Sequence, residues 1–326
     1  MNLKRLFYGI VLSTLCIQAL GQEVPFFTNK QLQYNYFNPG YIPELQYATI
    51  GISGKFQWVG LEGQPIDGFV SGKYFFLGAH SQIGFNMLYD KIGYQQVINP
   101  KLNYAFCIPI GDDCYLNMGM SAGLVNKNYD YNEIDYGNTL TNEQEEELRS
   151  KLERGNAADI DAGFEILIQN LEFGGAVNHL LKGNERITMN KTIFAFANYN
   201  FQSSEWWRLS PFYTFLGILA NDEKNHIWKH QMGLQFHYIT DYDNVPMDLF
   251  YIGAAYRHPR EGSVMAGFSF GFFSVFYSYD YFFGDLRNNT HGSHEVGIEF
   301  KIKQHDRGCY ANYGKTRKKF TRYFRM

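Results

Sequence analysis

Two histidines in this 326-residue chain have a spacing that could hold a metal ion. His226 and His230 stand four residues apart, just after Asp222 and Glu223. On a helix this spacing would place both imidazoles on one face. The residues after Trp228 alternate between apolar and polar types, which is typical of a strand, and in a strand positions four apart are separated by about 13 Å. We therefore interpret both histidines as incidental and expect no metal site.

The sequence also lacks other motifs that would indicate enzyme chemistry. His291 and His294 have no third ligand nearby. The chain has no Gly-x-Ser-x-Gly elbow, phosphate loop or dinucleotide fingerprint. The net charge of -3 argues against a general nucleic-acid binder. The sequence thus predicts a protein with no catalytic residue, cofactor or nucleic-acid partner.

Two cysteines could form a covalent link. Cys107 and Cys114 flank a turn that contains Gly111, and Cys309 follows much later. An oxidising envelope permits a disulfide, and cysteines that straddle a hairpin can approach bridging distance. The sequence does not show whether the two cysteines lie opposite each other. A disulfide bridge and two unpaired strand cysteines are therefore both possible interpretations.

The carboxylates Asp159, Asp161 and Glu165 belong to an alternating segment. Apolar residues at 160, 164, 166 and 168 take the opposite parity, so a strand here has one apolar and one charged face. A soluble sandwich would turn the charged face to bulk water, whereas a membrane barrel would turn it to a polar lumen and the apolar face to lipid. We expect the aspartates to pair with lumenal Lys or Arg, a structural role.

The same alternation recurs along the chain, for example at 49–58, 82–89, 231–238 and 295–303. Turn-rich breaks separate the runs, and about fourteen strands of roughly ten residues can be counted, the length that crosses a bilayer at a barrel's tilt. Phe, Trp and Tyr make up 18% of the chain. These features favour a transmembrane antiparallel up-and-down β-barrel over a soluble sandwich, because the charged faces could not be buried unpaired in a second layer.

The chain ends divide into separate segments. Residues 1–21 have the short basic start, apolar run and small-residue cleavage site of a signal peptide. We expect residues 22–46 to form an N-terminal periplasmic segment, residues 47–303 the outer-membrane barrel, and residues 304–326 a periplasmic tail. The loop from about 126 to 156 carries a capping box at 141–144, which predicts a short solvated helix.

Several motifs resemble one known family. They are Tyr34-Asn-Tyr-Phe-Asn-Pro-Gly-Tyr-Ile42, Gln57-Trp-Val-Gly-Leu-Glu-Gly-Gln-Pro65, Tyr89-Asp-Lys-Ile-Gly93, Leu102-Asn-Tyr-Ala-Phe106 with Ile108-Pro109, Tyr277-Ser-Tyr-Asp-Tyr281 and Ser293-His-Glu-Val-Gly-Ile298. The usual second Asn-Pro-Ala is replaced by Ile42-Pro43-Glu44. Together they look like the PorP/SprF family of outer-membrane proteins of the type IX secretion system in the Bacteroidetes. The resemblance covers nearly the whole chain after the signal peptide.

The resemblance implies a barrel without enzymatic activity in the outer membrane of a Gram-negative cell. It also implies roles in protein secretion, gliding motility and the surface attachment of a large adhesin with a type B C-terminal sorting domain. Periplasmic lipoprotein or ring components of the secretion system would be further partners, and outer-membrane lipid would surround the barrel. Because family members serve different adhesins, the individual cargo is not implied.

Two groups of residues are candidate partner-binding sites. Trp58, Gly60, Gly63 and Pro65 predict an interfacial aromatic anchor that opens a tight loop, either as a simple girdle feature or as a partner contact. The tail is basic and aromatic, with Lys315, Arg317, Lys318, Lys319 and Arg322. It could dock an acidic partner or the cell wall, or it could be a disordered solubilising tail.

Two functions follow from the sequence. The leading hypothesis is a non-enzymatic secretion-system component that anchors or escorts an adhesin. The alternative is an outer-membrane channel for passive or specific solute uptake, which would use the same polar lumen. The sequence does not predict whether the lumen is open or plugged, and it does not identify the cargo.

Overall fold

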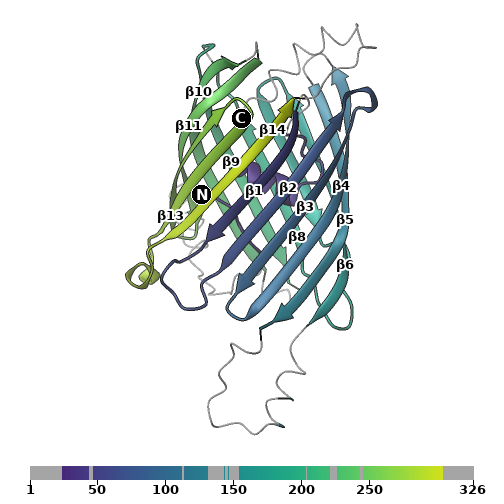
Figure 1. Cartoon of the computed structure of the whole chain (residues 1–326), viewed down its shortest axis with the longest axis vertical. Helices are drawn as coiled ribbons and strands as arrows, with labels where there is room; N and C mark the ends of the chain where they lie inside the picture. The colour runs from purple at the N-terminus through teal and green to yellow at the C-terminus, as the bar shows by residue number, and fades with distance from the viewer. Residues whose placement is uncertain are drawn as a thin grey trace, which may run out of the picture.

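The computed structural model describes residues 24–43, 47–111, 114–130, 143, 146, 154–202, 204–220, 226–242 and 245–303. The signal peptide expected at 1–21, the tail at 304–326 and most of the capping-box region lie outside these residues. The described chain forms a tall closed barrel of tilted strands (Figure 1). Among the described residues, no helix is long and apolar enough to cross a membrane.

Fourteen strands make up the barrel within the described ranges. They are β1 (Tyr47–Phe56), β2 (Ile66–Phe76), β3 (Ser81–Ile92), β4 (Gln95–Gly111), β5 (Cys114–Tyr129), β6 (Gly155–Ile168), β7 (Leu171–Asn178), β8 (Lys191–Tyr199), β9 (Trp207–Leu219), β10 (Ile227–Tyr242), β11 (Val245–His258), β12 (Glu261–Phe270), β13 (Phe273–Phe282) and β14 (Ser293–Lys303). Short helices with described bounds are α2 (Lys30–Phe37), η1 (Leu77–Ala79) and η4 (Asp285–Asn289).

Each strand pairs antiparallel with its sequence neighbours, and β1 closes on β14 with Tyr47 opposite Lys303 and Phe56 opposite His294. The order is therefore that of an up-and-down barrel, as the sequence predicts. Closure leaves every strand with two partners, which removes the free edge that an open sheet would present.

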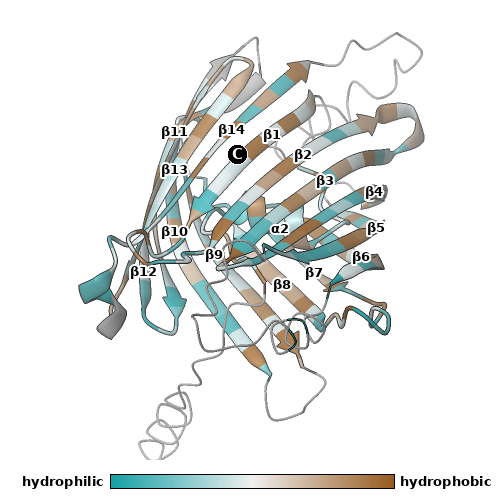
Figure 2. Cartoon of the chain, turned by 60° about the horizontal axis from the view of Figure 1, so that its bottom comes forward, coloured by the Kyte–Doolittle hydropathy of each residue, from teal (hydrophilic) through white to brown (hydrophobic). Residues whose placement is uncertain are grey.

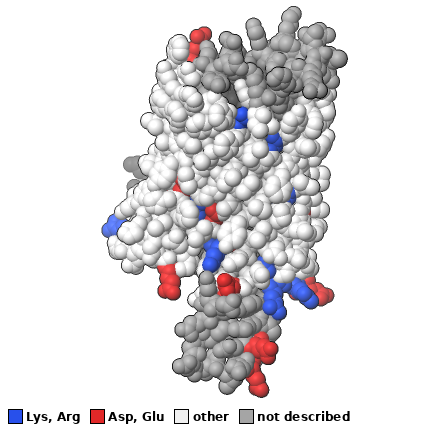
Figure 3. Space-filling model, in the orientation of Figure 1, with Lys and Arg blue, Asp and Glu red and all other residues white. Residues whose placement is uncertain are grey.

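The alternation of each strand sorts side chains between the two faces of the wall. Large apolar residues are exposed on the outside, including Ile52 (59%), Leu102 (69%) and Met120 (58%). Polar neighbours such as Ser53, Lys101 and Ser121 are buried on the inside. Apolar and polar residues alternate along the strands in Figure 2, and the visible wall in Figure 3 carries few charged side chains. This is the pattern of a barrel whose outer surface meets lipid.

The connections between strands differ at the two ends. Residues 57–65, 179–190 and 283–292 form longer connections at the end where the odd-numbered strands finish, which we call the Trp58 end. Turns at the other end are tight, as at 169–170 and 271–272. This difference is typical of an outer-membrane barrel, which has long outer loops and short periplasmic turns.

The two cysteines at 107 and 114 are both free thiols. Register explains this, because Cys107 lies opposite Asn117 and Cys114 lies opposite Gly111. A disulfide requires two cysteines whose side chains face each other at short range. The bridge that the sequence left open is therefore not formed.

Candidate functional site: the occupied lumen

The described N-terminal segment, residues 24–43, lies inside the barrel, and we call it the plug. Its helix α2 is visible within the lumen in Figure 2. The helix begins after Asn29, whose side chain accepts hydrogen bonds from the backbone N–H of Gln31 (2.9 Å) and Leu32 (3.3 Å). It ends before Pro39, which disfavours a helical conformation at Asn38. The sequence predicts a periplasmic segment at 22–46, so the lumenal position of its described part differs from that expectation.

Charged wall residues hold the start of the plug. Glu295 on β14 accepts hydrogen bonds from the backbone N–H of Thr28 (2.7 Å) and Asn29 (2.9 Å). The hydroxyl of Thr28 donates to Asp280 on β13 at 2.7 Å. Lys55 on β1 contacts this cluster, with its Nζ 2.9 Å from Asp280 and 2.9 Å from the Phe26 carbonyl oxygen.

Arg257 on β11 completes the cluster, with an Nη2 that donates to the Thr28 hydroxyl at 2.9 Å. Its Nη1 binds Glu261 at 2.6 Å and lies 3.6 Å from Asp280. Two buried cations and the acids Asp280 and Glu295 thus surround one short stretch of the plug. Each charge is compensated and hydrogen-bonded, which is the condition under which buried ions are tolerated.

An apolar stripe on β7, β8 and β9 receives the aromatic side of the plug. Tyr34 stacks on Phe196 with ring centroids 4.0 Å apart, and Phe37 stacks on Phe194 at 5.0 Å. Leu216 and Ile218 belong to the same buried cluster. Aromatic burial of this kind is the main apolar contribution to the packing between the plug and the wall.

The Asn38-Pro39-Gly40 turn packs against glycines of the wall. A Cβ on Gly40 would lie 2.7 Å from the Gly163 carbonyl oxygen on β6. A Cβ on Gly163 would collide with the Asn38 side chain, and one on Gly119 of β5 would collide with the Pro39 carbonyl oxygen. Gly119 and Gly163 are register partners, so they form one flat patch. This close approach gives a physical reason for the Asn-Pro-Gly motif.

The plug runs the length of the lumen before it joins β1. At the Trp58 end, Val24 lies near Ile227, and its carbonyl oxygen is 3.5 Å from Lys229 Nζ. At the other end, the Tyr41 carbonyl oxygen accepts from Lys73 Nζ at 2.8 Å, and Ile42 N–H donates to Glu165 at 3.3 Å. Burial lowers the pKa of Lys30 on α2 to about 7, although the nearby Glu172 opposes the shift.

Among the described residues, cavities remain on both sides of the plug, and two of them bear on the site. The larger one, about 520 Å³, lies toward the Trp58 end and is bounded by Tyr36, Asp90 and Met189, among others. A smaller one of about 90 Å³ lies toward the tight turns, between α2 and residues such as Ser71 and Ser274. The described structure therefore contains an occupied lumen with a vestibule at the Trp58 end.

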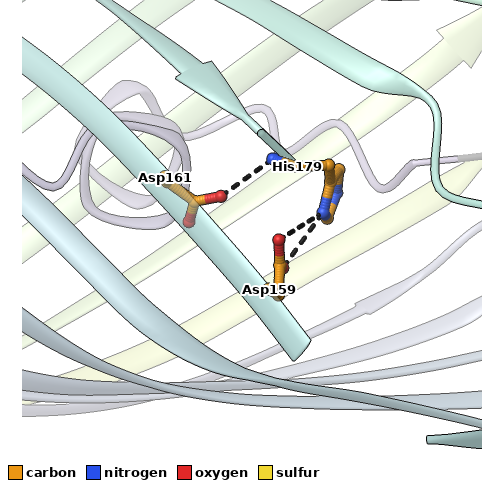
Figure 4. A group of neighbouring side chains, drawn as sticks. All are labelled: Asp159, Asp161 and His179. Atoms are coloured by element: carbon orange, nitrogen blue, oxygen red, sulfur yellow. Dashed lines mark hydrogen bonds and ion pairs between the residues drawn. The ribbon is translucent and has the colours of Figure 1, made fainter. Parts of the chain in front are cut away.

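Asp159 and Asp161 are brought together with His179, and among the described residues this is the one group of three residues of metal-ligand type at short range (Figure 4). His179 Nδ1 lies 3.0 Å from Asp159, and its backbone N–H donates to Asp161 at 3.0 Å. Lys101 Nζ binds both aspartates, at 2.7 and 2.6 Å. Ser121 also donates to Asp161 at 2.6 Å. The aspartates are paired with a lumenal lysine, as the sequence predicts, and this cation occupies the place that a metal would need.

The loop that contains Trp58 forms part of the barrel rim. Trp58 has a positive φ of 51°, and its backbone N–H donates to the Ser293 hydroxyl at 3.1 Å. Gly60 and Gly63 also have positive φ, and the Gly63 carbonyl oxygen accepts from Gly93 N–H at 3.1 Å. Pro65 closes the loop, since its carbonyl oxygen accepts from the N–H of Gln57 at 2.9 Å. The other predicted partner-binding residues, from Lys315 to Arg322, lie outside the described chain.

The two histidines lie on either side of the start of β10. His230 lies in β10, with its Nδ1 2.6 Å from the Tyr213 hydroxyl, while His226 precedes the strand. The sequence prediction of a loop entering a strand is confirmed.

The chain belongs to the family described as type IX secretion system membrane protein PorP/SprF, whose model matches residues 19–300. It is thus a component of the type IX secretion system in the outer membrane, and membership implies association with other components of that system. A comparison with curated proteins gives no match.

Several solved barrels are similar in shape. They include the toluene transporter TodX of Pseudomonas putida (8% identity, 82% of this chain and 93% of that chain, TM-score 0.49), the toluene transporter TbuX of Ralstonia pickettii (11%, 82% and 92%, 0.47) and the monoaromatic hydrocarbon channel CymD (12%, 88% and 96%, 0.48). None of these TM-scores reaches 0.5, so the assignment of function rests on the family.

Proposed function

We propose that this protein supports the secretion and surface anchoring of a large adhesin that carries a type B C-terminal sorting domain. The observation that carries the proposal is the family match over residues 19–300. The plug adds to it, because a lumen filled by residues 24–43 is poorly suited to solute uptake. The role is non-enzymatic: the charged groups of the lumen bind one another and the plug.

The orientation proposed here places the Trp58 end outside the cell. Longer connections at this end and tight turns at the other support it. The loop with Trp58, Gly60, Gly63 and Pro65 would then face the adhesin. The tail, with Lys315, Arg317, Lys318, Lys319 and Arg322, would lie in the periplasm and dock an acidic lipoprotein or ring component.

Deleting the gene and labelling the adhesin with antibody on intact cells tests the main proposal. We expect surface labelling to be lost and to return when the wild-type gene is restored. An unrelated secreted protein with a different sorting domain serves as the control and should be unaffected. Unchanged adhesin on the surface of the deletion strain would overturn the proposal.

Removal of residues 307–326 tests the proposed role of the tail. Co-purification from detergent extracts, followed by mass spectrometry, should lose the periplasmic partners while the barrel still inserts in the membrane. Equal partner recovery with and without the tail would leave it as a solubilising extension.

A further inference from the structure

One strand of the barrel lacks a second partner over half of its length. β6 pairs with β5 from Gly155 to Ile168, but it pairs with β7 only from Ala162 to Ile168. Residues 155–161 therefore have a strand on one side only, and we call their other side the open edge. An unpaired strand edge presents backbone N–H and C=O groups that can pair with another chain.

One hydrogen bond shows which backbone groups face the open edge. Leu180 N–H donates to the Ile160 carbonyl oxygen at 2.9 Å, so the polar backbone groups of Ile160 point away from β5. Successive residues of a strand direct these groups to alternate sides, and those of Ala158 and Asn156 therefore point the same way. Both residues are exposed. Within the described chain, no backbone hydrogen bond reaches Ala158 from the side of the open edge.

The segment after β7, residues 179–190, does not fill the missing place beside β6. Asn184 reaches the Asn156 carbonyl oxygen with its side chain, at 2.7 Å, rather than with its backbone. The segment instead forms a small hairpin of its own, bridged at Gly183 and Thr188. A strand that displaced this one side chain would supply the backbone partners that β7 does not.

The open edge lies above the lipid-facing part of the wall. The outward positions of β5 change from Leu124, which is 53% exposed, to Asn126 and Asn128. On β6, Asn156 lies opposite Asn126. Unpaired backbone groups are tolerated where water or protein can meet them, but not in hydrocarbon. In the orientation proposed above, the edge is therefore accessible from outside the cell.

The margin of the open edge is basic. Lys182 and Arg186 stand on either side of Asn184, both are exposed, and neither forms an ion pair with a described residue. Arg186 lies beside the edge, with its Cδ 3.7 Å from the position that a Cβ on Gly155 would take. Glu185 is the one acid of this hairpin. An incoming strand with acidic side chains therefore fits the margin better than a basic one.

We propose that the open edge of β6 binds an extended, acidic segment of the exported partner by adding it as a further strand. Main-chain hydrogen bonds to Asn156, Ala158 and Ile160 hold the segment, and Lys182 and Arg186 favour its acidic side chains. The source of the segment rests on the proposed function. The contact places the partner on the outer rim of the barrel, beside the lumen rather than within it.

Ala158→Pro tests the backbone contact. Proline removes the N–H that faces the open edge and leaves the hydrogen bonds between β6 and β5 in place, so the barrel should still fold. Heat-modifiable migration in gels reports the folded state. Ala158→Thr, which keeps the N–H, is the matched control.

The probe is a fluorescent peptide of sequence Thr-Asp-Val-Thr-Val-Asp-Thr, and its binding to the full chain in lipid nanodiscs is measured by fluorescence anisotropy. We expect Ala158→Pro to weaken binding about fivefold or more, the ratio typical of one lost hydrogen bond. Ala158→Thr should stay within about twofold of the wild type. Methylation of alternate peptide nitrogens should weaken binding at least as much as the proline does, and a peptide with Lys in place of Asp should also bind more weakly.

Absence of peptide binding to the wild type, equal binding to the proline and threonine variants, or binding that survives methylation would overturn the proposal. A concentration-dependent dimer that Ala158→Pro abolishes would also overturn it, because a second copy of the chain would then occupy the edge. Antibody labelling of the adhesin on intact cells separates this contact from the proposed function. Display that is lost on gene deletion but normal in Ala158→Pro would leave the function in place and remove the contact.

Discussion

Lys55 joins the wall to the plug through several polar contacts. It binds Asp280, the Phe26 carbonyl oxygen and the Thr28 hydroxyl, and it is almost fully buried. A buried cation of this kind cannot be removed without leaving acids that have lost their compensation. We therefore expect Lys55 to contribute more to the stability of the fold than a surface ion pair of the same length does.

We expect Lys55→Met to destabilise the folded barrel by about 3–5 kcal/mol, because Asp280 and Glu295 stay buried without their nearest cation. Urea titration monitored by heat-modifiable gel migration measures the loss. Lys191→Met, at an exposed position of β8, is the matched control and should change stability by less than about 0.5 kcal/mol. Equal midpoints for the two variants would contradict the assignment of Lys55 as a structural cation.

Sequence reasoning at the residue scale succeeded for charges and failed for close contacts. The alternation around Asp159 and Asp161 predicts inward carboxylates that need a cation, and Lys101 provides it. That Gly119 and Gly163 receive the Pro39 turn could not be predicted, since glycine also serves turns and bulges. Nothing in the spacing links residues so distant in the chain.

At the scale of elements, the turn at residues 38–40 depends on the flat glycine patch. We expect Gly163→Ala to displace the turn, because the added methyl group would collide with the Asn38 side chain. A lower unfolding temperature and faster proteolysis within residues 24–43 would report the displacement. Gly72→Ala is the control, since a Cβ there would meet only the Thr49 carbonyl oxygen at 3.9 Å. Equal rates of proteolysis in the two variants would show that the turn tolerates a side chain on this glycine patch.

The strands themselves were predictable because a period of two dominates wherever one face meets lipid and the other is polar. The plug was not predicted, although the sequence holds a signal for it. In segments 193–197 and 212–219, apolar residues occupy both parities. Such runs indicate a strand that is apolar on both faces, and here the inner face packs against α2.

At the scale of the whole molecule, we expect the plug to determine whether the barrel conducts. We expect the purified wild-type protein to be silent in planar bilayers, since residues 24–43 contact the wall from the Trp58 end to the tight turns. A variant that lacks residues 24–43 should give open currents, because a barrel of this strand number encloses a lumen once nothing fills it. Large open currents from the wild type would instead favour the channel alternative.

The global architecture was the most predictable level of all. About fourteen strands, antiparallel closure and an apolar exterior follow from segment lengths and from the need to satisfy every backbone group in lipid. Occupancy of the interior does not follow from these rules, because water, ion pairs and a folded segment are all compatible with a polar inner face.

The seam between β1 and β14 has a consequence for biogenesis. Lys55 and Glu295 lie directly opposite each other across this seam, and both form hydrogen bonds with residues 26–29. The first and last strands of the barrel must therefore meet around a segment that is already inside. We therefore expect closure of the seam and binding of the amino-terminal segment to occur in a single step. In an assembly intermediate with an open seam, the contacts from one of the two seam strands to this segment would be missing.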